Sequence, residues 1–154
     1  MALVTYKALC IDAVDAAVLG EFWAKALSYE LELLADGDAV LRGPGEGEEV
    51  WLNTVPEAKS VWHRVHLDIR AASLKPFADL RQVSGDGEFP WTTFADPEDG
   101  EFCVFTYDPP PERALKDIVV QALDHTAISD WWTDVIGGTI GHDDKSDYSH
   151  IADI

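Results

Sequence analysis

The chain has 154 residues, enough for one domain with a sizeable core or for one domain plus a fragment. Its composition, 47% hydrophobic and 26% charged, is ordinary for a folded protein. Acidic residues outnumber basic ones by 29 to 11, and the formal net charge of −18 argues against nucleic acid and anionic membranes as partners, because both attract clustered Lys and Arg. This charge would steer a cationic ligand toward the protein, or it serves only solubility.

The cysteines and the N-terminal residues indicate the cellular compartment of the protein. The two cysteines, Cys10 and Cys103, have neither the number nor the spacing of a disulfide framework or a zinc site. Residues 1–7 lack the basic region and long apolar run of a signal peptide, and no apolar stretch approaches the roughly eighteen residues of a membrane span. We therefore expect a cytoplasmic protein with reduced thiols.

The first part of the chain predicts a strand, a helix and three more strands. Asp15 is a typical N-cap, and the apolar residues after it recur at helical spacing. Asp36-Gly37-Asp38 is a hairpin signal, and residues 43–47 read as a loop. The expected strands are residues 5–12, 29–34, 39–42 and 49–55, and the expected helix is residues 16–27.

The same order then begins again. The second unit predicts a strand over residues 63–69, a helix over 74–83, and strands over 90–95 and 101–107; it lacks or hides one strand near residues 85–87. Positions 8, 10 and 12 of the first unit correspond to positions 64, 66 and 68 of the second. In the last strands, Trp51 corresponds to Cys103.

A third unit follows the breaker Asp108-Pro-Pro-Pro111. A strand over residues 118–122 precedes the N-cap Asp124 and a helix over residues 127–136, which Gly137-Gly138 ends. Residues 139–154 supply two more strands, and the last strand of the unit is missing. We therefore expect a domain over residues 1–110, made of units 1–58 and 61–108, and an incomplete third unit over residues 113–154.

The strand over residues 63–69 alternates between two kinds of side chain. His63, Val65, Leu67 and Ile69 point to one face, and Arg64, His66 and Asp68 point to the other. If the titratable face lines a cavity, it carries the chemistry of the protein; if it meets bulk water, it is a solvated strand face.

Three stretches in this order resemble the vicinal oxygen chelate superfamily, and within it the glyoxalase-like domains of the glyoxalase/bleomycin resistance/dioxygenase type. They are residues 15–27, residues 55–59 with 63–68, and residues 96–103. The resemblance covers residues 4–107, and the third unit looks like the opening half of a second copy. It implies an α+β fold, in which paired βαβββ units form a cupped mixed sheet around a small-molecule cavity, plus the incomplete third unit.

The resemblance also implies where metal ligands would stand, near the start of the first strand and on the last strand of each unit. The residues at these positions are Ala8, Arg64, Trp51 and Cys103. They replace the expected His, Gln and Glu, and a methyl group, a guanidinium and an indole do not coordinate metals at ordinary pH. We therefore expect no metal site and no cofactor. A divalent metal would need a nonstandard ligand set drawn from His66, Asp12, Asp68 and Cys103.

On this resemblance, the cavity-facing residues of both first strands lie together. The candidates for catalysis are His66 as a general acid or base, Asp68 as its orienting carboxylate, and Cys10 as a thiol that His66 activates. Arg64 suits a ligand carboxylate, or it pairs with Asp68 or Asp12. The ligand-binding candidates are Asp12, Trp51, Arg64, His66, Asp68, Cys103 and Phe105.

We therefore expect a metal-independent small-molecule binding protein of the glyoxalase/bleomycin-resistance type. The alternative is an enzyme, a lyase, isomerase or dioxygenase with nonstandard metal ligands or His66 acid–base chemistry. A structural role for the third unit is also open, because its helix has an apolar stripe and its sheet lacks a last strand. These features predict a homodimer in which residues 113–154 supply much of the contact. The stripe consists of Ile128, Trp131, Trp132, Val135 and Ile136.

Overall fold

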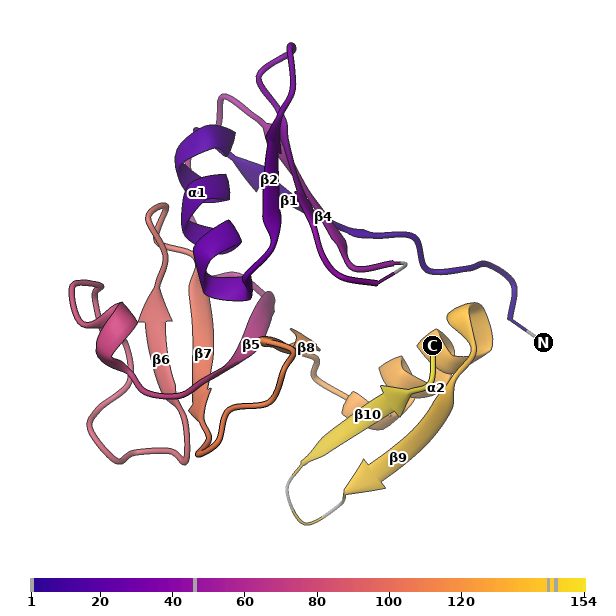
Figure 1. Cartoon of the computed structure of the whole chain (residues 1–154). Coiled ribbons are helices and arrows are strands. Elements are labelled where there is room, and N and C mark those ends of the chain that lie inside the picture. Colours follow the sequence, from indigo (N-terminus) through magenta and orange to yellow (C-terminus); the bar gives the residue numbers. More distant parts are fainter. Residues whose placement is uncertain (1, 46, 144, 146) are drawn as a thin grey trace. The chain divides into compact units, whose positions relative to one another are not determined.

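The computed structural model describes residues 2–45, 47–143, 145 and 147–154 (Figure 1). Of the predicted turns, Glu46 in the loop over residues 43–47, and Asp144 and Ser146 between the last two strands, lie outside the described residues. The chain divides into a larger unit, Ala8–Val120, and a smaller one formed by Met1–Lys7 and Gln121–Ile154. Each unit contains a helix and a sheet, both four-stranded sheets of the larger unit are mixed, and the predicted α+β class is confirmed.

The first βαβββ unit forms as the sequence predicts. The helix begins at the predicted cap, because the Asp15 carboxylate accepts hydrogen bonds from the backbone N–H groups of Ala17 and Val18. The four strands form one sheet in the order β1-β4-β3-β2, with β1 parallel to β4 and the other pairs antiparallel. The elements are β1 (Leu9–Ala13), α1 (Ala16–Leu27), β2 (Glu30–Leu33), β3 (Ala39–Arg42) and β4 (Glu49–Thr54).

The second sheet combines three strands of the second unit with one from farther along the chain. Its order is β6-β7-β5-β8, with β5 parallel to β7 and antiparallel to β8. In the larger unit, α1 lies against the first sheet and the second sheet stands below it in Figure 1. The elements are β5 (Val65–Ala71), η1 (Lys75–Phe77), β6 (Thr92–Ala95), β7 (Glu101–Thr106) and β8 (Leu115–Val120).

The helix predicted over residues 74–83 was wrong, because only the single 3₁₀ turn η1 forms there. The chain beyond it runs along the edge of β6 instead. The backbone N–H of Val83 donates to the carbonyl of Thr93, and Gln82 forms a bridge with β6. Backbone groups that bond to a neighbouring strand are not free for helical hydrogen bonds. This short bridge lies just before residues 85–87, where the sequence suggested a hidden strand.

The core of the larger unit confirms part of the alternation expected along β5. Leu67 and Ile69 are buried in the core that α1 covers. Its centre is Phe102, which makes edge-on ring contacts with Trp23. His63 and Val65, which were expected on the same face, are exposed. His63 precedes β5, and Val65 is the first residue of that strand.

The strand β8 differs most from the expected organisation. The sequence placed a strand over residues 118–122 at the start of the third unit, whereas β8 lies earlier and pairs with β5. The register shifts between Asp68 and Ile69, which marks an irregularity in this pairing. The larger unit therefore extends to Val120, and β5 has a strand on each side.

The smaller unit contains one helix and one hairpin. Asp124 caps the helix through the backbone N–H of Ala127, and the helix begins two residues earlier than predicted. The elements are α2 (His125–Ile136), β9 (Thr139–Asp143) and β10 (Tyr148–Ala152), with β9 and β10 antiparallel. The N-terminal segment belongs here too, since the N–H of Leu3 donates to the carbonyl of Val135. None of the described helices has the length and apolar character needed to cross a membrane.

The pairing of β8 with β5 predicts where the larger unit can be cut. A chain that ends at residue 120 should keep the denaturant midpoint of the larger unit. A chain that ends at residue 112 should be less stable by about 1–5 kcal/mol, because it loses five cross-strand pairs of about 0.2–1 kcal/mol each. Urea unfolding of the two truncated chains measures the difference. Equal midpoints would show that β8 does not support β5.

Candidate functional site

An open cavity of about 500 Å³ lies in the larger unit, a volume typical of small-molecule sites. The segment of residues 57–61, the start of β5 and the turn before β7 border it together with β1 and α1. Its apolar lining consists of Leu9, Ile11, Leu19, Trp23, Ala58, Val61, Val65 and Leu67. Its charged and polar lining includes Cys10, Asp12, Glu57, Lys59, Arg64, His66, Asp96, Glu98 and Glu101.

Four of the site residues predicted from the sequence line this cavity together: Cys10, Asp12, Arg64 and His66. Cys10 and Asp12 alternate on β1 and are exposed. Arg64 is also exposed and stands one residue before β5 begins.

Four other predicted site residues lie outside the cavity lining. Asp68 and Cys103 are buried beside His66. Trp51 stands opposite Cys10 on β4, and its indole N–H donates to Glu49. Phe105 lies farther along β7, within an aromatic group.

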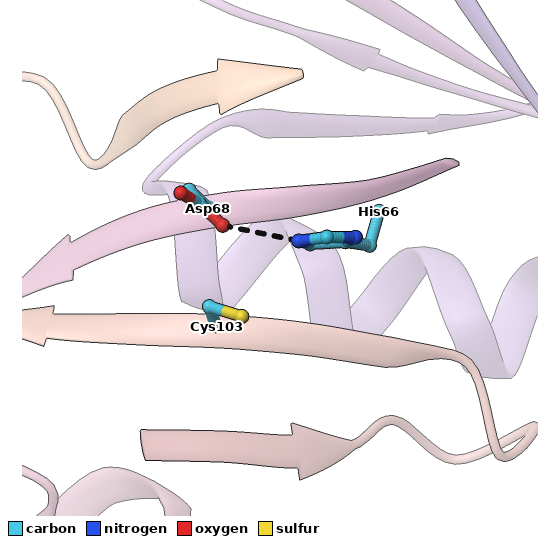
Figure 2. Close-up of side chains that lie close together, drawn as sticks. All are labelled: His66, Asp68 and Cys103. Carbon is cyan, nitrogen blue, oxygen red and sulfur yellow. Dashed lines mark ion pairs between the residues drawn. The ribbon is translucent and has the colours of Figure 1, made fainter. Parts of the chain in front are cut away.

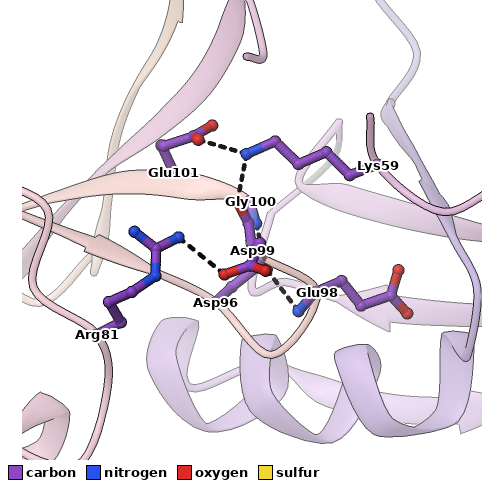
Figure 3. A network of polar contacts seen from close by, with 7 residues as sticks. All are labelled: Lys59, Arg81, Asp96, Glu98, Asp99, Gly100 and Glu101. Carbon is purple, nitrogen blue, oxygen red and sulfur yellow. Dashed lines mark hydrogen bonds and ion pairs between the residues drawn. The ribbon is translucent and has the colours of Figure 1, made fainter. Parts of the chain in front are cut away.

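A buried ion pair that the sequence analysis missed stands at the cavity wall. The Lys59 ammonium contacts both the carboxylate of Glu101 and the backbone carbonyl of Asp99 (Figure 3). Glu101 is only 8% exposed, and its second oxygen, Oε2, accepts no hydrogen bond from any described residue. A buried carboxylate oxygen without a donor is costly, and a ligand N–H or O–H group that reached this atom would offset the cost. Lys59 and Glu101 both lie in stretches that carry the family resemblance, residues 55–59 and 96–103, and this was the sequence signal for the pair.

The turn before β7 is fixed by its own carboxylates (Figure 3). Asp96 accepts hydrogen bonds from the backbone N–H groups of Glu98 and Gly100, at 2.9 and 2.7 Å. A Cβ atom at Gly100 would lie 2.6 Å from Asp96 Oδ2, so the turn requires glycine there. Burial raises the pKa of Asp96, although these N–H groups act in the opposite direction. Glu98 accepts from the N–H groups of Val14 and Asp15, at 2.8 Å each, and so ties this turn to the start of α1.

His66, Asp68 and Cys103 form a cluster beside the cavity (Figure 2). His66 and Asp68 alternate on β5, and Cys103 is the register partner of Asp68 on β7. Side chains two residues apart on a strand, and register partners on adjacent strands, share one face of a sheet. His66 Nε2 lies 3.4 Å from Asp68 Oδ1, and Lys116 Nζ lies 3.7 Å from Asp68 Oδ2.

The cluster shifts the titration of His66. Burial alone would lower the pKa of the imidazole, but the Asp68 carboxylate and Cys103 raise it more strongly, to about 9. In the metal-free protein His66 is therefore a cation at neutral pH. In that form it can donate a proton, and it pairs with the Asp68 carboxylate.

The same face of the second sheet carries aromatic side chains next to the cluster. The rings of Phe89 and Trp91 stack at 5.0 Å, and Trp91 lies 5.3 Å from Phe105. The Lys116 ammonium stands over the Phe105 ring at 4.6 Å. Phe105, expected as a ligand contact in the cavity, thus belongs to a separate aromatic surface.

The positions at which the family resemblance implies metal ligands do not fit a metal in this structure. Ala8 offers no donor atom, the Arg64 guanidinium is exposed and cannot coordinate, and the Trp51 indole is donor-only. Cys103 is the one residue of the four with a ligand atom, and its sulfur lies 3.5 Å from the Thr93 hydroxyl.

The raised pKa of His66 gives a pH dependence that can be measured on chelator-treated protein. A histidine with a folded pKa near 9 and an unfolded value of about 6.5 adds stability that is complete below pH 6.5 and is lost as pH rises through 9. The free energy of unfolding should therefore fall across this window. NMR titration of the imidazole should show the transition near pH 9 in the native chain and at a lower pH in Asp68→Asn. An imidazole that titrates near 6.5 in both would contradict the assignment.

Comparison with known proteins identifies the family. The model of a family described as a glyoxalase-like domain matches residues 8–105. This range includes β1, β5 and β7, the strands that contribute residues to the cavity lining. A comparison with curated protein sequences found no match.

Solved structures are similar in fold at low sequence identity. The oxidase ChaP-H2 is 15% identical over 68% of this chain and 94% of its own, with a TM-score of 0.50. A glyoxalase/bleomycin resistance protein/dioxygenase from Nocardioides is 19% identical over 71% of this chain and 89% of its own, with a TM-score of 0.48. A V. cholerae integron cassette protein is 17% identical over 70% and 98%, with a TM-score of 0.47. The match over residues 8–105 shows that this chain belongs to the glyoxalase-like domain family.

Proposed function

We propose that the chain binds a small organic cation with an apolar body in the cavity of the larger unit, through protein groups alone. The observation that carries this proposal is the buried Glu101 carboxylate, whose Oε2 atom accepts no hydrogen bond from the described residues. A ligand ammonium or amidinium would supply the missing donor, and charged hydrogen bonds of this kind are the strong ones.

The rest of the cavity supports a ligand of this class. Trp23 and Leu67 supply apolar contact area at its walls, where burial of a ring or alkyl body is favourable. Asp12 and Glu57 add negative charge at its rim. The net charge of −18 steers cations to the protein from solution.

This binding does not use the metal that the family resemblance implies. That metal would polarise a substrate oxygen, and the residues at its positions here offer only one ligand atom between them. Direct recognition by a carboxylate and apolar walls is the function that the remaining groups support best.

A pair of aromatic ligands of the same size tests the proposal. Naphthylmethylamine, a cation at neutral pH, should bind chelator-treated protein more tightly than the anion naphthylacetate. Replacing Glu101 by Gln should weaken the amine at least about tenfold, since a hydrogen bond to a charged group contributes about 1.5–3 kcal/mol. Isothermal titration calorimetry measures both affinities.

Glu32→Gln is the matched control for this substitution. Glu32 is also a carboxylate paired with a basic side chain, Arg42 at 2.6 Å, but it stands on β2 outside the cavity lining. Glu32→Gln removes the same charge as Glu101→Gln, and it should leave the affinity for naphthylmethylamine unchanged. Equal losses in the two variants, or equal affinities for amine and carboxylate ligands, would refute the proposal.

We also propose that the chain forms a homodimer through its smaller unit. Trp131 and Trp132 on α2 are 53% and 37% exposed, more apolar surface than a helix of this size usually leaves in water. The hairpin β9-β10 is a two-stranded sheet with no further strand among the described residues, and such sheets are marginal on their own. A second copy would cover both features by one isologous contact.

The dimer predicts a concentration-dependent mass in analytical ultracentrifugation at micromolar protein. The double change Trp131→Gln and Trp132→Gln should yield a monomer, because it removes the apolar surface that the contact buries. Trp62→Gln is the control, because Trp62 is 54% exposed but belongs to the larger unit. A native chain that stays monomeric throughout would contradict the dimer.

A further inference from the structure

A serine hydroxyl in the smaller unit lies between two imidazoles. Ser149 on β10 is the register partner of His142 on β9, and register partners share one face of a sheet. The Ser149 Oγ atom lies 2.7 Å from Nδ1 of His142 and 2.7 Å from Nδ1 of His125, the first residue of α2. Both distances are those of good hydrogen bonds, so partners on two sides hold this oxygen in place.

A carboxylate faces the other nitrogen of His142. Asp130 on α2 places its Oδ1 atom 3.5 Å from His142 Nε2. This separation is longer than a good hydrogen bond, but catalytic contacts are often long before a substrate binds. The negative charge favours the tautomer of His142 that carries its proton on Nε2. In that tautomer, the Nδ1 atom toward Ser149 is a hydrogen-bond acceptor.

The tautomer of His142 sets the direction of the other hydrogen bonds. A hydroxyl has one proton to donate, and the Ser149 hydroxyl donates it to His142 Nδ1. The Nδ1 atom of His125 then carries a proton and donates it to the Ser149 oxygen. One directed chain therefore runs from His125 through Ser149 and His142 to Asp130. The donor on His125 also stabilises negative charge that develops on this oxygen.

These residues combine the parts that activate a serine: a nucleophile beside a base, and a third group that orients the base. We propose that Ser149 is a nucleophile that accepts the acyl group of a carboxylic ester, with His142 as its general base and Asp130 as the orienting carboxylate. The side chains of His142 and Asp130 are 32% and 61% exposed, and Ser149 is half-buried. Solvent therefore reaches the site from the His142 side.

The reaction proceeds in two balanced steps. The Ser149 oxygen forms a bond to the ester carbonyl carbon while His142 Nδ1 takes the hydroxyl proton. The bond between this carbon and the leaving oxygen then breaks, and His142 passes the proton to that oxygen. Water attacks the acyl-serine in the same way, which releases the carboxylic acid and restores the Ser149 hydroxyl. An ester suits this site better than an amide, because an alkoxide or phenoxide leaves more readily than an amine.

This site is separate from the cavity proposed for the organic cation. Its four residues belong to the smaller unit, within Gln121–Ile154, whereas the cavity lies in the larger unit, Ala8–Val120. The cation is tested by its affinity, and the serine is tested by acyl transfer. Failure of one proposal therefore leaves the other unaffected.

Two probes applied to the full-length chain test the serine. p-Nitrophenyl acetate is a small acyl donor, and its product p-nitrophenolate absorbs visible light, so the rate of hydrolysis can be followed directly. Phenylmethylsulfonyl fluoride forms a stable sulfonyl ester with an activated serine and releases fluoride. The chain should hydrolyse the acetate faster than free imidazole does at equal concentration. Peptide mass spectrometry should locate the sulfonyl group on Ser149.

Four variants separate the roles of the side chains. Ser149→Ala should reduce the hydrolysis rate to background, and His142→Gln should lower it about 10²–10⁴-fold, the usual contribution of a general base. Ser129→Ala is the control for the serine, because the Ser129 hydroxyl donates to backbone carbonyls of α2. His150→Gln is the control for the imidazole, because His150 is the next residue of β10 and its ring lies over Gly141. Both controls should keep the native rate, and circular dichroism checks that each variant is folded.

A folded native chain without a sulfonyl group on Ser149 would overturn the proposal, and this result requires no variant. Equal rates of acetate hydrolysis in the native chain and in Ser149→Ala would overturn it as well, because other side chains would then carry the reaction. In either case the hydrogen bonds of Ser149 would serve only to join α2 to the hairpin of β9 and β10.

Discussion

The alternation of side chains along β5 is the constraint on which the larger unit depends. Leu67 and Ile69 enter the core that α1 covers, and this fixes His66 and Asp68 on the opposite face. A shift of one residue would bury a carboxylate and an imidazole among Trp23 and Phe102, at a cost of several kcal/mol. Because β5 also has a strand on each side, its register is held by β7 and β8 as well as by the core.

Two chemical environments meet at His66 as a result. On one side is a cavity with apolar walls and a buried carboxylate, Glu101, that has an oxygen without a donor. On the other side, Asp68 and Cys103 place negative charge and a sulfur within reach of the same imidazole. The cavity has the room for an organic body, whereas the cluster satisfies its own charges through the ion pair of His66 and Asp68.

The sequence predicted the first βαβββ unit well, because its signals are local: the N-cap Asp15, the helical apolar spacing and the turn at Gly37. It failed where backbone hydrogen bonding to distant strands decided the outcome. Residues after η1 pair with β6, and β8 joins β5. The repeat brought Cys10, Asp12, Arg64 and His66 together correctly. It could not reveal the pair of Lys59 and Glu101, because these residues are 42 positions apart and meet only after β5 and β6 have folded.

We propose that the cavity beside β5 is the place where this chain binds its ligand. Backbone amide chemical-shift mapping by NMR, with naphthylmethylamine titrated into chelator-treated protein, is the decisive experiment. The shifts should gather around Trp23, Leu67 and Glu101, and saturate with one affinity. Shifts that gather in Gln121–Ile154, or that spread evenly over the acidic surface without saturating, would contradict it.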